Sequence, residues 1–539
     1  MPTVTEPSLH GEMKTLVILL AAKGHWEYEH AYDVFDDLFA KVEPEIVVVA
    51  QMKPDSGPPS EAEVPEGLQR LKEKHGVKSL RGCFIKSNST DDGSNNHWSE
   101  YIPEVLGSLD LRLKETSKEN LNLHVSAGGF TVSAALYNIS QILGCRAWNT
   151  IGGRGSDSWY AEEVLETPKF TPAQSSTLAK CAQDSIESGG PQTFTSPEIE
   201  SMDGTPGPKG SNMSMKGLIR DGYLEEKAEK SKRGKVQYLP TGKGLLEGIF
   251  QLSKSTRKRK PDDPQTGIII TARAANSKEQ FREFLHEHGY HNQFTKVGLV
   301  VVDFFEEYDL EEKAAEFNEV VRDLKGTGVV GGAKSCNGVI PTAQGQLSHC
   351  SFGLLSQLHS IISSNEGELV DWSILSTGVP AILRTNFLRY SQESGSSVIE
   401  TFRGLRSGGS GSRGSEYSIS GQDFRKHRIE CPVINDIEKM RELWDWKHQY
   451  IREGLATLLV LDQPIGYNNY QLLEANEEYF PDESQWQRMK FTVPKSKAVQ
   501  KSHEKMVKQG AITDRGDVFE LTEVGKAAAR MIWIREQEW

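Results

Sequence analysis

The sequence lacks an apolar run that could cross a membrane. Its best run, residues 16–22, has the length of one strand, whereas a membrane-spanning helix needs about 18 or more apolar residues. The N-terminal peptide MPTVTEPSLHGEMK contains acidic residues and no cationic segment, so it predicts no signal peptide. Both features predict a cytoplasmic protein with no membrane partner.

Paired cysteines and the common catalytic motifs are missing as well. The six cysteines are scattered without a CxxC pair, which predicts reduced thiols rather than a disulfide framework or a zinc site. The absence of GxxxxGK[ST] argues against a P-loop ATPase, and the absence of GxSxG argues against the usual hydrolase elbow. No HExxH segment accompanies the histidines at 286, 288 and 291, so we predict no metal.

Positive charge is not in excess. The chain has 62 Lys and Arg against 75 Asp and Glu, a formal net charge of −13, which argues against a protein covered in basic residues. A local basic patch is still allowed. With 37% hydrophobic and 25% charged residues the composition is globular. A length of 539 residues predicts three or four domains, at ~150 residues per domain.

The N-terminal segment alternates strands and helices. Apolar runs of strand length occur at residues 16–22, 45–51, 83–85 and 121–125. Helical spacing between them implies right-handed crossovers and a parallel, doubly wound α/β sheet. Ligands of such sheets bind beyond the carboxyl ends of the strands, so we expect Ala22, Lys23 and Gly24 to contact a ligand.

The peptide after the strand at 121–125 is the most informative one. Ser126, Gly128 and Gly129 form a small-residue turn, and Thr131 follows at the start of an amphipathic helix. Two glycines let a ligand approach the backbone, and the free N–H groups of a helix N-terminus attract anions. We predict that these four residues bind the ligand. The alternative is a tight turn that binds nothing.

These features resemble the CRISPR-associated Rossmann fold, the CARF domain. The resemblance covers roughly residues 14–155 and depends on the strand order, the turn at 126–131 and the helix at 132–144. It implies a homodimer that senses a cyclic oligoadenylate across its two-fold axis and needs no other cofactor. Members commonly place a Thr and a basic residue just after the glycines, whereas here Phe130 precedes Thr131 and Val132 follows it.

Residues 171–253 fit a winged helix-turn-helix. Two helical segments are followed by a basic hairpin around Gly234, in which Lys232, Arg233 and Lys235 are the predicted nucleic-acid contacts. The C-terminal segment repeats this pattern. GKVQYLPTGKG (234–244) matches GDVFELTEVG (516–525) apart from one extra proline, which predicts a second winged helix.

A second α/β domain follows the basic linker at 254–265. Strand and helix patterns alternate again from residue 266, and this domain is a candidate duplicate of the first. The GTGVVG peptide at 326–331 fits GxGxxG, but a helix precedes it where a dinucleotide site needs a strand. We interpret it as the end of a helix and the start of a strand.

A cluster of cations at 401–428 suggests one possible chemistry. Arg425 and His427 lie beside a Gly/Ser-rich loop, where Arg425 could bind a phosphodiester and His427 could transfer a proton during RNA cleavage. The alternative is an exposed loop without a catalytic role. Whether the chain is an enzyme therefore stays open; if it is one, we expect a ligand-activated nuclease, with RNA favoured over DNA.

The predicted order begins with a Rossmann-like CARF sensor at 1–155, a winged helix-turn-helix at 171–253 and a linker at 254–265. An effector-like α/β domain at 266–430 follows, and then a helical segment with a C-terminal winged helix at 431–539. By resemblance, this is a cyclic-oligoadenylate-responsive effector or regulator of type III antiviral defence whose output acts on DNA or RNA. The alternative is a metabolite-responsive winged-helix transcription regulator without catalysis.

Overall fold

The computed structural model describes most of the chain. The described residues are 13–20, 25–52, 64–85, 97–109, 117–126, 130–152, 159–164, 168–195, 198, 215–227, 236–256, 265–288, 294–341, 345–364, 370–376, 379–399, 428–429, 431–444, 455, 465–466, 501, 504–514 and 518–536. None of the helices in these ranges is long and apolar enough to cross a membrane.

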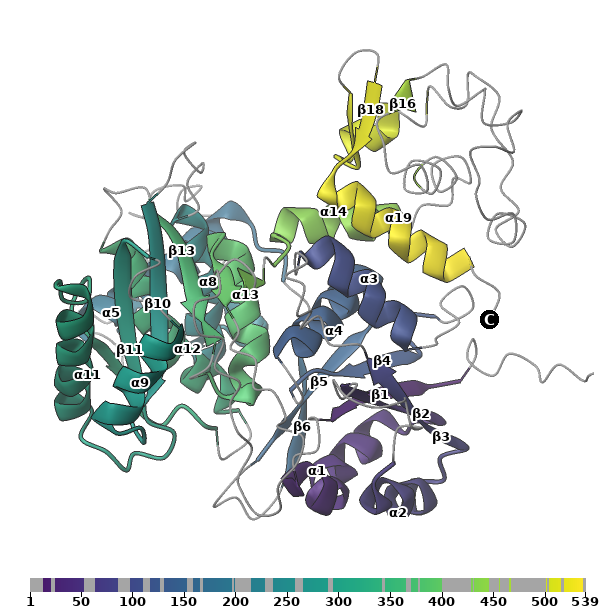
Figure 1. The fold of residues 1–539 in the computed structure, drawn as a ribbon, viewed down its shortest axis with the longest axis horizontal. Coiled ribbons are helices and arrows are strands. Elements are labelled where there is room, and N and C mark those ends of the chain that lie inside the picture. The colour runs from purple at the N-terminus through teal and green to yellow at the C-terminus, as the bar shows by residue number, and fades with distance from the viewer. Residues whose placement is uncertain are drawn as a thin grey trace, which may run out of the picture. The chain divides into compact units, whose positions relative to one another are not determined.

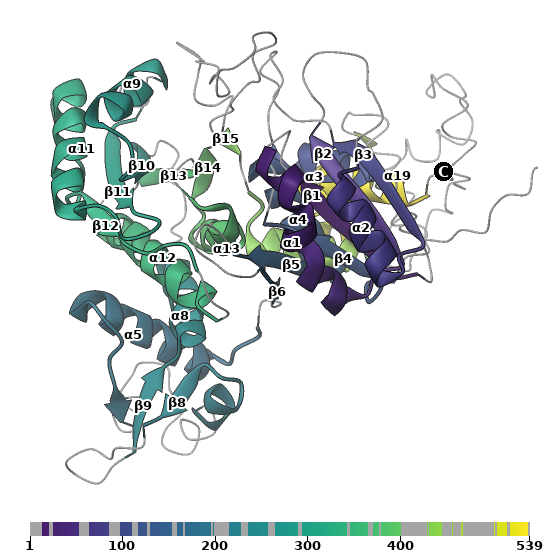
Figure 2. The same ribbon diagram turned by 90° about the horizontal axis from the view of Figure 1, so that it is seen from below.

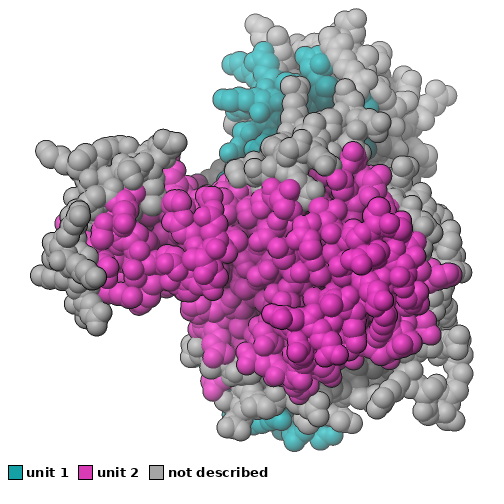
Figure 3. All heavy atoms as spheres, turned by 90° about the vertical axis from the view of Figure 1, so that its left-hand side faces the viewer, with its two compact units in different colours: residues 1–92, 96–150, 432–539 teal, residues 93–95, 151–431 magenta. Residues whose placement is uncertain are grey.

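The chain forms two compact units, which Figure 3 shows in different colours. Unit 1 contains residues 1–92, 96–150 and 432–539, and unit 2 contains residues 93–95 and 151–431. Each unit therefore combines segments that lie far apart in the sequence.

Unit 1 contains a parallel sheet with the strand order β3-β2-β1-β4-β5. Its strands are β1 (Thr15–Leu20), β2 (Ile46–Met52), β3 (Ser79–Ile85), β4 (Leu121–His124) and β5 (Arg146–Ile151). Val17 of β1 lies beside Val48 of β2 and Leu123 of β4. These central strands are wholly buried, which explains why they appear in the sequence as continuous apolar runs.

Four helices cover the two faces of this first sheet. They are α1 (His25–Val42), α2 (Glu66–His75), α3 (Trp98–Ser108) and α4 (Phe130–Leu143). The first two lie on one face and the last two on the other (Figures 1 and 2). This is the doubly wound arrangement expected of a Rossmann-like domain.

Unit 2 contains a second sheet with the equivalent order, β12-β11-β10-β13-β14-β15. Its strands are β10 (Gln265–Arg273), β11 (Lys296–Val302), β12 (Lys334–Cys336), β13 (Val370–Leu375), β14 (Ser397–Ile399) and the antiparallel β15 (Arg428–Ile429). Its helices are α9 (Lys278–His288), α11 (Leu310–Lys325), α12 (Leu347–Ser363) and α13 (Arg384–Ser394), the last preceded by η2 (Ala381–Leu383). The predicted fold class, α/β with an N-terminal Rossmann-like parallel sheet and a second α/β domain, is confirmed.

Each sheet is followed in the sequence by a smaller module. The first module has α5 (Pro172–Ser188), β7 (Phe194–Thr195), a short helix at 215–220, β8 (Leu224–Glu226), β9 (Gln237–Pro240) and α8 (Gly242–Thr256). The second module has α14 (Ile434–Trp444), β16 (Ile465–Gly466), β17 (Ile512–Asp514), β18 (Val518–Leu521) and α19 (Glu523–Glu536). β6 (Tyr160–Val164) precedes the first module.

The strands of the two modules are arranged alike. Their antiparallel sheets have the orders β7-β9-β8 and β16-β18-β17, with the last strand of each in the middle. This is the order that a winged helix-turn-helix requires. The winged-helix interpretation stays a prediction, because the hairpin tips at 228–235 and 515–517 lie outside the described residues.

Candidate functional site

A buried polar network lies at the carboxyl end of β4, just before the predicted ligand turn. The Nε2 atom of His124 lies 3.1 Å from the Thr150 hydroxyl and 2.9 Å from the Ser126 hydroxyl. The Ser126 oxygen also accepts a hydrogen bond of 2.9 Å from the Thr150 backbone amide. Because all three residues are buried, the network holds the start of the turn against β5.

The imidazole in this network is neutral at physiological pH. His124 is completely buried, and its ring is perpendicular to that of Phe35 at a centroid distance of 5.1 Å. Burial lowers the pKa of His124 from 6.5 to about 3, and an interaction with the backbone of Leu19 opposes this shift only in part. A proton on this ring would therefore weaken the part of the sheet that precedes the predicted ligand turn.

We expect unit 1 to lose stability in mild acid because of His124. The folded state binds this proton less readily than the unfolded chain, so the stability is complete above pH 6.5 and falls as the pH drops toward 3. Between pH 7 and pH 5 the expected loss is about 2 kcal/mol. Urea unfolding at both pH values should show this loss in the wild type and not in His124→Gln. An equal loss in both proteins would contradict the assignment.

The structure describes part of the predicted ligand site. The Ser126 side chain is committed to the network above, and Thr131 lies in the first turn of α4 with its side chain outside the described residues. The remaining predicted ligand residues also lie outside the described residues: Ala22, Lys23, Gly24, Gly128 and Gly129. The predicted ligand site thus stays a prediction, on a turn whose base is fixed by His124 and Thr150.

In the second sheet, Asp303 organises the loop at the carboxyl end of β11. This buried carboxylate follows β11 and accepts hydrogen bonds from the backbone amides of Phe305, at 3.2 Å, and Tyr308, at 2.7 Å. Its role in the structure is to organise the loop that leads to α11. Within the described ranges, no group of three or more His, Cys, Asp or Glu side chains could hold a metal ion.

The GxGxxG peptide has the structural role predicted for it. α11 ends at Gly326, which has a φ of 77° and closes the helix, and β12 begins shortly afterwards at Lys334. Since no helix begins at these glycines, they form a helix end and a connection rather than a dinucleotide site.

Both modules share one local structure around a threonine. The Thr241 hydroxyl donates to the Gly222 carbonyl, at 2.8 Å, and accepts from the Gly244 amide, at 3.1 Å. The Thr522 hydroxyl likewise donates to the Gly510 carbonyl, at 2.6 Å, and accepts from the amide of Gly525, at 3.1 Å. The repeated sequence pattern is therefore a repeated structure. In each module a threonine caps the last helix, α8 or α19, here called the closing helix, and fixes it to the preceding turn.

The predicted nucleic-acid and catalytic residues cannot be placed on these modules and sheets. Lys232, Arg233 and Lys235 lie outside the described residues, as do Arg425 and His427. Their roles stay predictions.

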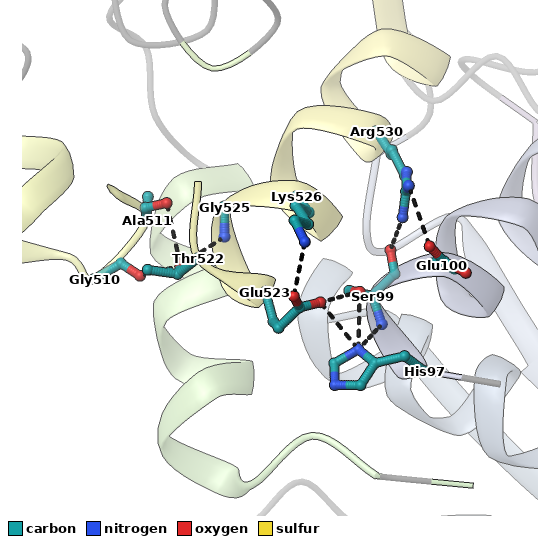
Figure 4. A network of polar contacts seen from close by, with 10 residues as sticks. All are labelled: His97, Ser99, Glu100, Gly510, Ala511, Thr522, Glu523, Gly525, Lys526 and Arg530. Carbon is teal, nitrogen blue, oxygen red and sulfur yellow. Dashed lines mark hydrogen bonds and ion pairs between the residues drawn. The ribbon is translucent and has the colours of Figure 1, made fainter. Parts of the chain in front are cut away.

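In unit 1 the second module is joined to the first sheet by polar contacts (Figure 4). Glu523, the first residue of α19, accepts a hydrogen bond of 2.6 Å from the Ser99 hydroxyl of α3 and lies 3.2 Å from His97. Burial would raise the pKa of Glu523, but hydrogen bonds from Ser99 and Lys526 lower it overall. Arg530 donates to the Ser99 carbonyl at 3.1 Å, so α19 is attached to the N-terminus of α3 at two points.

In unit 2 the first module is joined to the second sheet by a buried ion pair. Arg389 of α13 donates two hydrogen bonds of 2.6 Å to the two carboxylate oxygens of Glu247 in α8. The exposed fractions of these side chains are 7% and 9%, so the pair is removed from water. The guanidinium also lies 4.2 Å from the centroid of the Phe250 ring. A second contact joins Lys254 to buried Glu393 at 3.7 Å, and burial raises the pKa of Glu393.

Sequence reasoning missed these contacts, although a weak signal for one of them exists. Glu247 interrupts the apolar peptide GLLEGIF, and Arg389 interrupts NFLRY. A single charge within an apolar helix face needs a partner of opposite sign, so the two could have been paired.

The chain has little similarity to known proteins. No protein-family model matches the chain, and no curated protein matches it. Among solved structures, the chain is similar to a type III CRISPR defence DNA nuclease activated by cyclic oligoadenylate, with a TM-score of 0.32 and 10% sequence identity. The alignment covers 72% of this chain and 65% of that chain, so this chain spans slightly less than two thirds of that nuclease. Similarity this low transfers neither an activity nor a ligand.

Proposed function

We propose that this protein is a ligand-responsive regulator whose Rossmann-like sheets sense a cyclic oligoadenylate and whose modules act on nucleic acid. One observation carries the proposal. In each unit the closing helix of a module packs on the helices of a Rossmann-like sheet, α19 on α3 and α8 on α12 and α13. Such packing offers a physical route by which a ligand at a sheet edge can shift a nucleic-acid-binding module.

The ligand class follows from the turn after β4. Two adjacent glycines at the head of α4 suit a phosphate-bearing ligand, because the backbone can be approached closely and the helix N-terminus attracts anions. The CARF resemblance narrows this class to cyclic oligoadenylates and implies binding across a homodimer. Type III CRISPR defence is the setting that this ligand would indicate.

A regulatory output is favoured over a nuclease by the second sheet. Residues 266–430, considered as an effector domain on sequence, contain a sheet with the strand order of the first. The shared strand order is better explained if the second sheet is a second sensor-like domain than if it is an effector domain of a different fold. Ligand-dependent cleavage of labelled RNA or DNA that disappears in His427→Ala would instead assign a nuclease.

Gly129→Asp is expected to abolish binding of cyclic oligoadenylates. The carboxylate would occupy the space where the ligand meets the backbone and would repel its phosphates. Calorimetry with cyclic oligoadenylates of increasing ring size measures the affinity and the stoichiometry per chain. Gly190→Asp is the matched control, because a side chain at Gly190 meets nothing within 4 Å and adds the same charge. Unchanged affinity in folded Gly129→Asp would contradict the ligand site.

Replacing Lys232, Arg233 and Lys235 with alanine should weaken DNA binding and flatten its dependence on salt. Each lost phosphate contact reduces counterion release, so the slope of log affinity against log salt should fall by up to about 3. The control replaces Lys278, Arg282 and Lys313, which changes the net charge equally on α9 and α11. If the wild type binds no DNA at low salt, or if both variants behave alike, the first module is not the DNA contact.

A further inference from the structure

The second half of the chain repeats the first half in order, sheet and then module. Two structural markers align the repeats. The capping residues Thr241 and Thr522 align α8 with α19, and the left-handed glycines Gly144 and Gly395, with φ of 69° and 73°, align the ends of α4 and α13. Positions in one repeat can therefore be compared with positions in the other.

Each compact unit combines a sheet with the module that does not follow it directly in the sequence. The first sheet shares unit 1 with residues 432–539, and the second sheet shares unit 2 with the first module. The first turn of a sheet helix meets the first residue of a closing helix in both cases: Ser99 meets Glu523 in unit 1, and His349 meets Gly242 in unit 2.

The buried charges make this pairing selective. In the alignment of the closing helices, the residue equivalent to Glu247 is Ala528. In the alignment of α13 with α4, the residue equivalent to Arg389 is Asn138. If the first module packed on the first sheet, Glu247 would lose its arginine, because the residue equivalent to Arg389 is Asn138. If the second module packed on the second sheet, Arg389 would face Ala528. Both mismatches separate Arg389 from Glu247, and a guanidinium buried without its carboxylate is strongly unfavourable.

The first residue of each closing helix differs between the two modules, and so does the side chain that it meets. A Cβ atom built on Gly242 would lie 2.6 Å from the ring of His349, so this exposed side chain would have to turn away from it. The equivalent residue in the second module is Glu523, so that module cannot place its first helical residue against His349 without displacing it. In unit 1 the same position faces Ser99, which is small and binds the Glu523 carboxylate.

We infer that the two repeats exchange their modules, and that the buried pair of Arg389 and Glu247 determines which module binds which sheet. The partner of the α3 and α4 surface is thus the module from the far end of the same chain. If the proposed function holds, a ligand at the first sheet acts on residues 432–539 rather than on the adjacent module. The exchange itself does not depend on that function.

Thiol cross-linking in the full-length chain tests the exchange. A Cβ atom on Gly107 of α3 would lie 3.5 Å from Ile534 of α19, so Gly107→Cys with Ile534→Cys reports the exchanged pairing. The residue equivalent to Ile534 in α8 is Ser253, so Gly107→Cys with Ser253→Cys reports the pairing without exchange. A short bifunctional thiol reagent followed by peptide mass spectrometry should yield the 107–534 product and no 107–253 product.

Single-cysteine variants and a linker cut complete the experiment. Each single variant should give no product, which excludes reactions of the native cysteines. When the linker at 257–263 is replaced by a protease site and cut, the 107–534 cross-link should join the two pieces into one band of 60.0 kDa. A 107–253 product, or no product from either pair, would overturn the exchange. DNA and nucleotide binding are not measured here, so a failure of the proposed function would leave this result unaffected.

Discussion

Arg389→Met is expected to destabilise unit 2 by about 3–5 kcal/mol, the usual cost of leaving one member of a buried ion pair without its partner. Glu247 would keep its carboxylate in a site where its exposed fraction is 9%, and both 2.6 Å hydrogen bonds from the guanidinium would be lost. The contact with the Phe250 ring would be lost as well. Urea unfolding should therefore show the transition of unit 2 at a lower concentration.

The double variant Arg389→Met with Glu247→Leu separates the charge from the packing. With both charges removed, apolar side chains of similar size fill the site, and we expect most of the stability of the wild type to return. Hydrogen exchange should show the single variant opening α8 and α13 while α19 stays protected. Equal destabilisation by the single and double variants would mean that the site depends on shape rather than on the charge.

The sheets could be predicted from the sequence because their signal is local. Continuous apolar runs such as 16–20 and 46–50 belong to strands that helices cover on both faces, and this burial leaves a direct mark on composition. The repeated Thr and Gly positions of the modules were also visible, because a helix cap and a close backbone contact restrict residue type. The predicted ligand turn depends on similar reasoning about its two glycines, and it stays a prediction.

The pairing of modules with sheets could not be predicted in this way. Ser99 and Glu523 are 424 positions apart, and Glu247 and Arg389 are 142 apart, so no local pattern connects them. The network of His124, Ser126 and Thr150 was missed for a related reason. It joins two neighbouring strands of a sheet, and a histidine in a short strand gives no sign that its partners come from the next one.

Gly244→Ala and Gly525→Ala are expected to destabilise units 2 and 1 by similar, large amounts. A Cβ atom on Gly244 would lie 2.0 Å from the Tyr223 carbonyl oxygen, and one on Gly525 would lie 1.9 Å from that of Ala511. Both obstacles are backbone atoms, held in place by the hydrogen bonds from Thr241 and Thr522.

Helix propensity favours alanine over glycine and therefore opposes the loss of stability expected from these two variants. In an open helical site alanine is favoured over glycine by about 1 kcal/mol. Here the closing helix must move away from its turn, and we expect a net loss of about 3 kcal/mol or more for each variant. Gly190→Ala is the control, because nothing lies within 4 Å of a Cβ at that position. Urea unfolding should show each variant lowering the transition of its own unit only, Gly244→Ala in unit 2 and Gly525→Ala in unit 1. A stabilising effect at either glycine would show that the threonine-capped turn can yield, and that the two modules are less rigidly built than their shared hydrogen bonds imply.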